Sequence, residues 1–223
     1  MKKKIVIVGA SSGLGRELAL LLHKKGAELF VLSRTIDTGH FPKIGITKVV
    51  CDVADAMSIK EAFSEIDKVA KQIDVLINCA GIGLEQKLER VPPEKIKQII
   101  DTNLVGAILV SQEGYKRMLK AKKGYIINIS STSGKKARAL ETIYCASKWG
   151  LAGFSESLRL EARDHGIRVT TVYPGGMKTS FYDANPEKDT SKFMNPADVA
   201  QQIVCLLESD VSITPSELVI ERS

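Results

Sequence analysis

Residues 4–15 read KIVIVGASSGLG, and this stretch decides the fold. The run 5–8 contains only β-branched residues, as expected for a parallel strand that is buried on both faces. The glycine-rich half leads into residues 14–25, which carry apolar side chains at helical spacing and end before Gly26. A strand, a glycine loop and a helix in this order predict the first unit of an α/β fold.

The rest of the chain alternates between the same two periodicities. Further strands are predicted at 28–32, 47–50, 74–77, 124–129, 167–173 and 217–220, and further helices at 59–72, 92–120, 144–164 and 196–208. Strands that alternate with helices over the whole length predict parallel βαβ units. We therefore expect a doubly wound, Rossmann-type parallel sheet of about seven strands with helices on both faces, in a single domain over residues 1–223.

Composition is typical of a soluble globular protein, with 44% hydrophobic and 26% charged residues among 223. No apolar run reaches the ~20 residues that span a bilayer, and the apolar run 5–8 is too short for a signal peptide. The four cysteines are scattered without a CxxC pair, which argues against a metal site or a disulfide framework. We expect a cytoplasmic protein with no membrane segment and no metal.

The net charge of +6 raises the question of an acidic partner. Basic residues cluster at 116–123, and a basic surplus can indicate nucleic-acid binding. This cluster ends a predicted helix, however, where cations complement the helix dipole. Aromatic residues make up only 5% and do not interleave with the basic runs, as a stacking platform requires. We favour a solvated face and expect no nucleic-acid partner; a basic-patch scaffold or nucleic-acid binder remains the alternative.

Tyr144 and Lys148 stand four residues apart near the start of a predicted helix, so their side chains share one face. A nearby ammonium favours the phenolate and lowers a tyrosine pKa from its usual value near 10. An ordinary surface pair would have the same spacing. Ser131, thirteen residues upstream and just past a predicted strand, favours a proton-transfer unit instead.

The glycine loop predicts a binding site for a pyrophosphate. Glycines allow a tight turn and close backbone approach, and the following helix N-terminus supplies amide donors. The spacing here is GxxxGxG rather than GxGxxG. A purely structural turn is the less favoured interpretation, because the loop lies between a strand and a helix.

Together these features resemble the short-chain dehydrogenase/reductase family over nearly the whole chain. The matching motifs, in chain order, are Gly9, Gly13 and Gly15 in the glycine loop; Asn78-Cys79-Ala80-Gly81 for Asn-Asn-Ala-Gly; Asn103; Ser131; Tyr144 with Lys148; and Pro174-Gly175 followed by Thr179.

The resemblance implies roles for the catalytic set. Ser131 would donate a hydrogen bond to the substrate carbonyl oxygen as charge develops, and Tyr144 would transfer the proton. Lys148 would lower the tyrosine pKa and hold the nicotinamide ribose, and Asn103 would order a water that links Lys148 to solvent. A helix-bending core amide is the other interpretation of Asn103. Ser130 is the rival hydroxyl, and the spacing to Tyr144 favours Ser131.

The resemblance also implies cofactor contacts, with Asp52 near the adenine ring. The predicted contacts are Gly9, Ser11, Ser12, Gly13, Leu14, Gly15, Ser33, Arg34, Asp52, Val53, Asn78, Ala80, Gly81, Tyr144, Lys148, Pro174, Gly175, Met177 and Thr179.

Cofactor choice is decided at the end of the second strand. NAD-dependent enzymes of this fold place an acidic residue there, whereas this chain has Ser33 and then Arg34. A guanidinium can bind a 2′-phosphate through charge-assisted hydrogen bonds. We therefore predict NADP(H) in preference to NAD(H). Two other positions depart from the family: Val8 replaces the usual Thr and Cys79 the second Asn, which suggests an apolar contact between them.

The segment 176–195 is long and polar, and we predict a substrate lid rather than a disordered excursion. Its apolar residues are Phe181, Tyr182, Phe193 and Met194. A second loop precedes Tyr144 and would either contact an acidic substrate or lie on the surface. Its cations are Lys135, Lys136 and Arg138.

The resulting hypothesis is an NADP(H)-dependent oxidoreductase that interconverts a small carbonyl compound and its alcohol. A non-catalytic cofactor-binding regulator is the alternative, and the intact Ser-Tyr-Lys set argues against it. In the family, the helices that hold Asn103 and Tyr144 pack against their symmetry mates. Three apolar residues of the second helix suit a two-fold interface, so we expect a homodimer or homotetramer. These residues are Trp149, Phe154 and Leu158.

Overall fold

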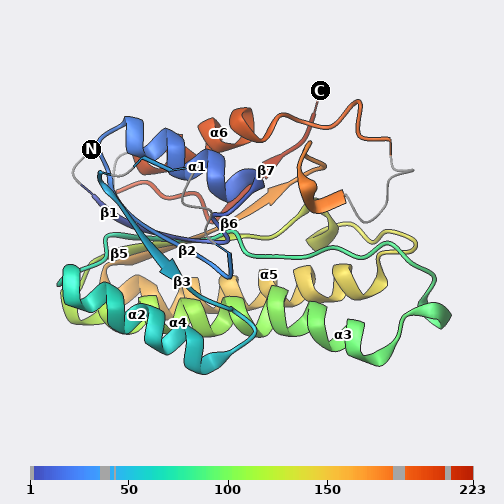
Figure 1. The fold of residues 1–223 in the computed structure, drawn as a ribbon, viewed down its shortest axis with the longest axis horizontal. Helices are drawn as coiled ribbons and strands as arrows, with labels where there is room; N and C mark the ends of the chain where they lie inside the picture. The colour runs from blue at the N-terminus through green and yellow to red at the C-terminus, as the bar shows by residue number, and fades with distance from the viewer. Residues whose placement is uncertain (1–2, 36–40, 43, 183–188, 209–211, 223) are drawn as a thin grey trace.

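Seven parallel strands form one sheet in the order β3-β2-β1-β4-β5-β6-β7 (Figure 1). The computed structural model describes residues 3–35, 41–42, 44–182, 189–208 and 212–222. The strands are β1 Lys4–Val8, β2 Glu28–Ser33, β3 Ile46–Val50, β4 Val75–Asn78, β5 Gly124–Ile129, β6 Ile167–Pro174 and β7 Glu217–Ile220. This confirms the predicted doubly wound sheet, and each predicted strand lies within one residue of its observed limits.

Helices cover both faces of the sheet (Figure 1). One face carries α1 Gly13–Lys24 and α6 Pro196–Glu208, and the other carries α2 Ala56–Val69, α4 Gly106–Ala121 and α5 Thr142–Ala162. The central strands are apolar on both sides because both layers need a core. Residues 5–8, for example, are all buried, with alternate side chains in the two cores.

The strand order reverses between β1 and β4. The chain runs from β1 outward to β3, then crosses to β4 and continues to the opposite edge at β7. In open α/β sheets, ligands bind at such a switch point, outside the carboxyl ends of the strands. The sheet topology therefore places the glycine loop after β1 beside the loop after β4.

The predicted helix 92–120 is continuous but irregular. It consists of α3 Pro93–Ile100, one π-helical turn Asp101–Val105 and then α4. Gly106 follows the turn, and a Cβ there would lie 2.4 Å from the backbone oxygen of Val53. The helix can therefore approach the loop after β3 only because this position is glycine.

The helix predicted at 59–72 begins earlier than expected. Its first residue is Ala56, because the carboxylate of Asp55 caps the helix and accepts from the Met57 backbone N–H at 2.8 Å. It ends at Val69, since Ala70 adopts an extended conformation. Short 3-10 turns complete the secondary structure: η1 Leu88–Arg90, η3 Thr132–Gly134, η4 Arg163–His165 and η5 Ser180–Tyr182.

Within the described ranges, no helix combines the length and apolar content needed to cross a membrane.

Candidate active site

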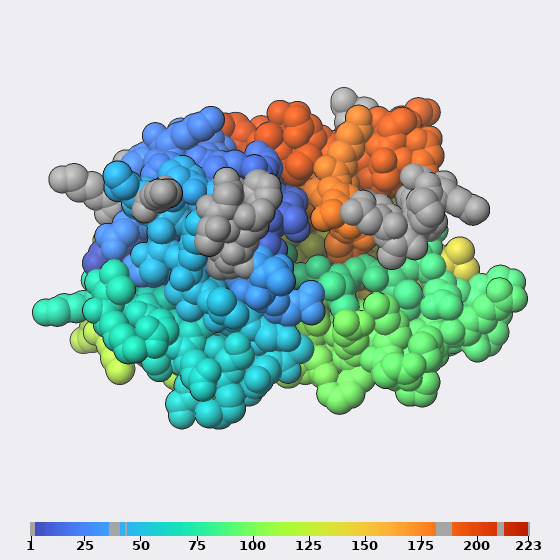
Figure 2. Space-filling view, in the orientation of Figure 1, coloured from blue at the N-terminus to red at the C-terminus, as the bar shows by residue number. Residues whose placement is uncertain are grey.

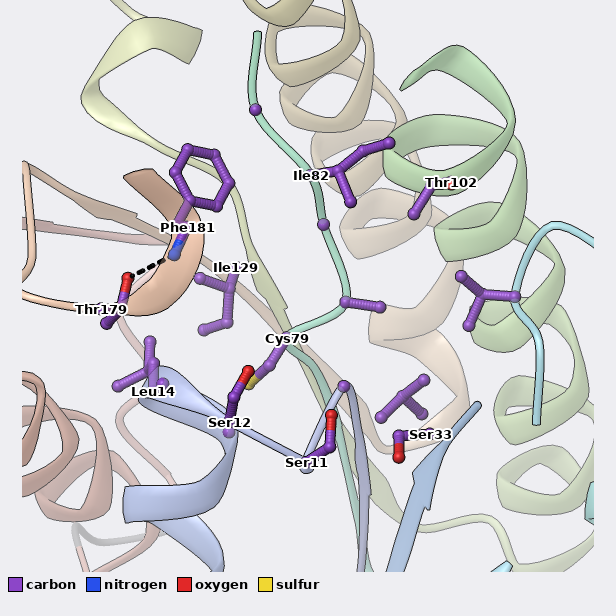
Figure 3. A pocket seen from close by; sticks show the side chains of 18 of the residues that line it. Ser11, Ser12, Leu14, Ser33, Cys79, Ile82, Thr102, Ile129, Thr179 and Phe181 are labelled. Carbon is purple, nitrogen blue, oxygen red and sulfur yellow. Dashed lines mark hydrogen bonds between the residues drawn. The ribbon is translucent and has the colours of Figure 1, made fainter. Parts of the chain in front are cut away.

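A cavity of about 460 Å³ opens at the carboxyl ends of the central strands. It appears in Figure 2 as a hollow between the blue, orange and green surfaces, and Figure 3 shows its walls. Ser131, Tyr144 and Lys148 line it together with every predicted cofactor contact except Asn78. Asn103 also lies outside the lining. The structure therefore gathers the predicted residues from loops that follow six different strands.

The glycine loop packs directly against the loop after β4. Gly9 has φ +79°, and a Cβ there would lie 2.5 Å from the backbone nitrogen of Ala80. A Cβ at Gly15 would lie 2.3 Å from the backbone oxygen of Gly9. Neither position has room for a side chain, so the backbone itself lines this part of the cavity. The N–H groups of Gly9 and Ala10 donate to the backbone oxygen of Leu32, at 2.8 and 3.2 Å, and the helix N-terminus begins at Gly13. This cradle fits the pyrophosphate of a dinucleotide.

Lys148 is buried beside Tyr144. Its ammonium donates to the backbone oxygen of Ile129 at 3.0 Å and lies 5.8 Å from the centroid of the Tyr144 ring. Because only 4% of the residue is exposed, desolvation lowers the pKa of Lys148 to about 8. The ammonium is thus held at the end of the cavity where Tyr144 lies.

The two adjacent serines have different environments. Ser130 is buried and its hydroxyl donates to the backbone oxygen of Lys148 at 3.0 Å, which ties β5 to α5. Ser131 is less buried, and its hydroxyl oxygen accepts from the Ser133 N–H at 3.1 Å. Accepting that bond leaves the hydroxyl proton of Ser131 available for donation. This favours Ser131 over Ser130 as the donor to a substrate.

Asn103 braces the loop after β4. Its amide donates to the backbone oxygen of Ile82 at 2.8 Å and to the hydroxyl of Ser147 at 3.1 Å, and its side-chain oxygen accepts from the Ile82 N–H at 2.8 Å. A Cβ at Gly81 would lie 3.4 Å from that oxygen and 3.5 Å from the ammonium of Lys148. Both amide protons are therefore used within the protein, as the core-amide interpretation expects.

Asn78 belongs to a polar network beneath the sheet rather than to the cavity. Its side chain donates to the hydroxyl of Ser111 at 2.9 Å and to the side-chain oxygen of Asn128 at 2.8 Å. Asn128 donates in turn to the hydroxyl of Ser155 at 2.9 Å. The network joins β4 and β5 to helices α4 and α5. The Asn78 side chain therefore does not line the cavity, and its cofactor contact stays a prediction.

The suggested apolar contact between Val8 and Cys79 is also wrong. Val8 lies in the core beneath α2 and α4, whereas Cys79 packs against the core on the opposite face of the sheet. What joins them is a backbone bond from the Cys79 N–H to the Val8 oxygen at 2.9 Å. Desolvation raises the pKa of Cys79 to about 12 despite the opposing effect of the Lys148 cation.

The residues predicted to select the cofactor lie at the end of β2. The hydroxyl of Ser33 donates to the backbone oxygen of Thr35 at 2.9 Å, and Arg34 is exposed at the rim of the cavity. After β3, Asp52 accepts from the Ala54 N–H at 3.0 Å, which shapes the neighbouring turn. Ser33, Arg34 and Asp52 all line the cavity.

The two ends of the predicted lid pair with each other. The Met194 N–H donates to Gly176 at 3.0 Å, and the Lys178 N–H donates to Met194 at 2.9 Å. Phe193 packs over Gly176, where a Cβ would lie 2.9 Å from its ring. Residues 183–188 of this segment lie outside the described residues. The lid itself stays a prediction.

The cations before Tyr144 are engaged away from the cavity. Lys135 pairs with Glu217 at 2.6 Å, and Lys136 pairs with Glu221 at 3.4 Å. Arg138 donates to the hydroxyl of Thr132 at 3.1 Å. None of the three cations lines the cavity, which favours the surface interpretation over contact with an acidic substrate.

The basic cluster 116–123 is partly neutralised. Lys116 contacts Glu113 at 2.8 Å, and Arg117 contacts both Asp67 and Glu113 at 2.7 Å. Arg117 also lies over the Phe63 ring at 4.9 Å. These pairs support the solvated-face interpretation.

Several cavity residues were not anticipated from the sequence. They are Thr35, Cys51, Ile82, Gly83, Lys95, Thr102 and Ile129, whereas Ser180 and Phe181 lie in the predicted lid segment. Ile82 and Gly83 directly follow a predicted motif, so extending that motif by two residues would have found them. Lys95 and Thr102 reach the cavity only through the packing of α3 and its π-helical turn, and no local pattern marks them.

The predicted contact surface on α5 needs correction. Leu158 is buried and Phe154 packs against the core, so only Trp149 of the three predicted residues is exposed, at 52%. Leu160, exposed at 54%, and the small Ala146 lie on the same side of the helix.

Comparison with known proteins gives one consistent result. A family model described as short chain dehydrogenase matches residues 3–190. Carbonyl reductase family member 4 of Xenopus laevis is 36% identical, over 99% of this chain and 97% of its own length. A 3-oxoacyl-(acyl-carrier-protein) reductase of Bos taurus is 33% identical, with the same coverage of both chains.

Solved structures agree with the sequence relatives. ElxO with NADP bound has a TM-score of 0.89 and 27% identity, over 99% of this chain and 97% of that one. A variant of actinorhodin polyketide ketoreductase with NADPH has a TM-score of 0.87 and 26% identity, over 98% of this chain and 95% of that one.

Proposed function

The chain belongs to the short-chain dehydrogenase/reductase family of oxidoreductases, and we propose that it interconverts a carbonyl compound and its alcohol with NADP(H). The observation that carries the proposal is the meeting of Ser131, Tyr144 and Lys148 in the cavity that the glycine loop also lines. A hydride acceptor or donor and a proton donor are the two requirements of this chemistry.

The residues that would hold the cofactor follow from the cavity lining. The amides of residues 11–15 would bind the pyrophosphate, Asp52 and Val53 would border the adenine, and residues 174–179 would border the nicotinamide. When bound, the nicotinamide supplies or accepts the hydride.

Ser131 and Tyr144 would act on the carbonyl oxygen. During reduction the hydroxyl of Ser131 donates a hydrogen bond to the oxygen, which stabilises the negative charge that develops there. Tyr144 then gives its phenolic proton to the oxygen, which completes the alcohol and leaves a phenolate. In the oxidative direction the same phenolate takes the proton back.

Lys148 would stabilise that phenolate. An ammonium beside the phenol lowers the free energy of the charged form, and burial strengthens this interaction because little water screens it. Since desolvation lowers the pKa of Lys148 to about 8, the ammonium is still mostly protonated near neutral pH. Asn103 would keep the loop after β4 in place around this group.

Preference for NADP(H) rests on Ser33 and Arg34. The end of β2 carries no carboxylate to repel a 2′-phosphate, and the exposed guanidinium of Arg34 can bind it. The two similar solved structures named above, which contain NADP or NADPH, support this choice.

A screen of ketones, aldehydes and sugars, followed by the absorbance of NADPH, tests the proposal. We expect NADPH oxidation with at least one carbonyl compound and its loss in Tyr144→Phe. Tight NADPH binding without turnover on any class of carbonyl would instead support a cofactor-binding regulator.

A further inference from the structure

Phe181 forms an apolar wall directly beside Tyr144. The ring centroids are 5.6 Å apart at an interplanar angle of 63°, an edge-to-face arrangement. The backbone N–H of Phe181 faces the hydroxyl of Thr179 at 3.4 Å, which anchors the ring at the start of η5 (Figure 3).

Gly83 provides the space that this ring occupies. A Cβ at Gly83 would lie 2.4 Å from Cε1 and 2.6 Å from Cζ of Phe181. Real Cβ atoms do not approach so closely, so any side chain at residue 83 would displace the ring. The loop after β4 and the segment after β6 therefore meet through one glycine and one phenylalanine.

Further apolar side chains lie at this end of the cavity, beside the hydroxyls of Thr102, Ser131 and Ser180. Ile82, Ile129 and Met177 line it, and Figure 3 shows Ile82 and Phe181 on facing walls. Among the described residues that line the whole cavity, the charged ones are Arg34, Asp52, Lys95 and Lys148.

None of these charges is placed to receive an anion beside the substrate carbonyl. Arg34 and Asp52 follow β2 and β3, on the other side of the switch point from Tyr144. Lys95 donates to the side chain of Gln98 on an exposed part of α3, and Lys148 is bonded to Ile129. Within the described part of the chain, a carboxylate or phosphate next to the carbonyl would therefore meet no cation placed to pair with it, and burying an unpaired charge is costly.

We propose that Gly83 and Phe181 form a specificity pair that selects carbonyl substrates with a hydrocarbon substituent, best an aromatic one. The ring supplies an edge or face for aromatic contact, and Gly83 sets how far the ring stands from Tyr144. This inference rests on the proposed function and names its substrate class.

Turnover of an aryl ketone and of a 2-oxo acid of similar size tests the pair. We expect wild-type kcat/KM to favour the aryl ketone by roughly two- to tenfold, the effect of one aromatic contact. Gly83→Ala should lower kcat/KM for the aryl ketone roughly tenfold, because the new methyl group displaces the ring. The Kd for NADPH, measured by fluorescence, should not change in this variant.

The matched control is the same glycine substitution without the ring. Phe181→Ala alone should show a similar loss for the aryl ketone. Adding Gly83→Ala to it should cost less than about twofold, because the methyl group then meets no ring. NADPH binding and a melting curve for each variant show that the fold is retained.

Three outcomes would overturn the specificity pair while leaving the reductase proposal intact. They are a preference for the 2-oxo acid, a Gly83→Ala enzyme equal to wild type, and losses that multiply in the double variant. A wild-type protein that binds NADPH but reduces no carbonyl compound would overturn the proposed function and this inference with it.

Discussion

The hydroxyl of Ser133 donates to Oε2 of Glu141 at 2.8 Å, and this bond joins the turn that carries Ser131 to the helix that carries Tyr144. On one side, the Ser133 N–H donates to the hydroxyl oxygen of Ser131. On the other, the backbone oxygen of Glu141 accepts from the Cys145 N–H at 2.7 Å. Together with the bonds of Ser130 and Lys148 that tie β5 to α5, this hydrogen bond holds the two proposed catalytic hydroxyls at their separation.

Replacing Glu141 tests this positioning role. Glu141→Ala removes the acceptor, so Ser131 and Tyr144 are oriented less well. We expect kcat to fall roughly tenfold, which corresponds to a rise of about 1.4 kcal/mol in the activation free energy. The Kd for NADPH should stay unchanged. Glu141→Gln keeps an acceptor oxygen and should restore most of kcat. Equal losses in the Ala and Gln variants would show that the hydrogen bond does not matter.

Tyr144→Phe should remove the proton donor and little else. We expect kcat to fall at least about 100-fold, the lower end for general acid catalysis, with NADPH affinity retained. Steady-state kinetics on the best substrate from the screen provide the measurement. More than a tenth of wild-type kcat in this variant would refute the role of Tyr144.

Cofactor preference should follow Arg34. A hydrogen bond to a charged group contributes about 1.5–3 kcal/mol, so kcat/KM should favour NADPH over NADH by roughly 10- to 150-fold. Ser33→Asp combined with Arg34→Ala should reverse the preference, because it adds a repelling carboxylate and removes the cation. Equal kcat/KM for the two cofactors in the wild type would contradict the prediction without any variant.

Lys148 should cost stability below pH 8. Its pKa in the folded protein, about 8, lies below its ordinary value of 10.5. The folded state therefore binds this proton less tightly, and the full cost is present below pH 8 and disappears as pH rises toward 10.5. In Lys148→Met, removal of the buried cation should raise the free energy of unfolding by ~3 kcal/mol. Loss of the hydrogen bond to Ile129 should lower it by about 1 kcal/mol.

Urea unfolding of the cofactor-free protein checks this balance. At pH 7 the Lys148→Met variant should be more stable than the wild type by about 2 kcal/mol, although it should be inactive. At pH 10 the difference should largely vanish. A variant that is less stable than the wild type at pH 7, or an identical difference at both pH values, would show that the buried cation is not the cause.

Assembly remains a prediction, now with a corrected surface. The exposed Trp149 and Leu160 of α5 suit a two-fold contact between copies. Light scattering at micromolar concentration should therefore give the mass of a dimer or tetramer, and Trp149→Glu should reduce it. A monomeric wild type would end this interpretation.

The fold could be predicted in detail because its signals are local. The β-branched run 5–8, the glycine loop and the alternation of periods placed every strand within one residue. The start of α2 was placed wrongly because the apolar period was followed from Ile59 and the capping carboxylate of Asp55 was overlooked. The helical spacing of the apolar residues was interpreted correctly, but the N-cap residue that precedes them was not recognised.

The site residues that belong to a sequence motif could be predicted, and those that tertiary packing brings to the site could not. Ser131, Tyr144 and Lys148 were identified by spacing and line one cavity. Cys79 and Val8 were assigned a contact because the two departures coincide, but side chains at these positions point to opposite faces of the sheet. The register of β1 with β4 pairs Val8 with Asn78, so Cys79, one residue later, points to the other face. This register cannot be read from the sequence.

The π-helical turn Asp101–Val105 restricts which changes of length the chain can tolerate. Ile99 and Met118, both buried, are nineteen positions apart, whereas five regular α-helical turns advance the chain by about eighteen positions. The extra residue keeps the buried side chains of α3 toward α5 while those of α4 face β4 and β5. Deleting one residue from the turn would rotate one half of the long helix by about 100° relative to the other. Viable insertions and deletions in natural or engineered versions should therefore avoid residues 101–105.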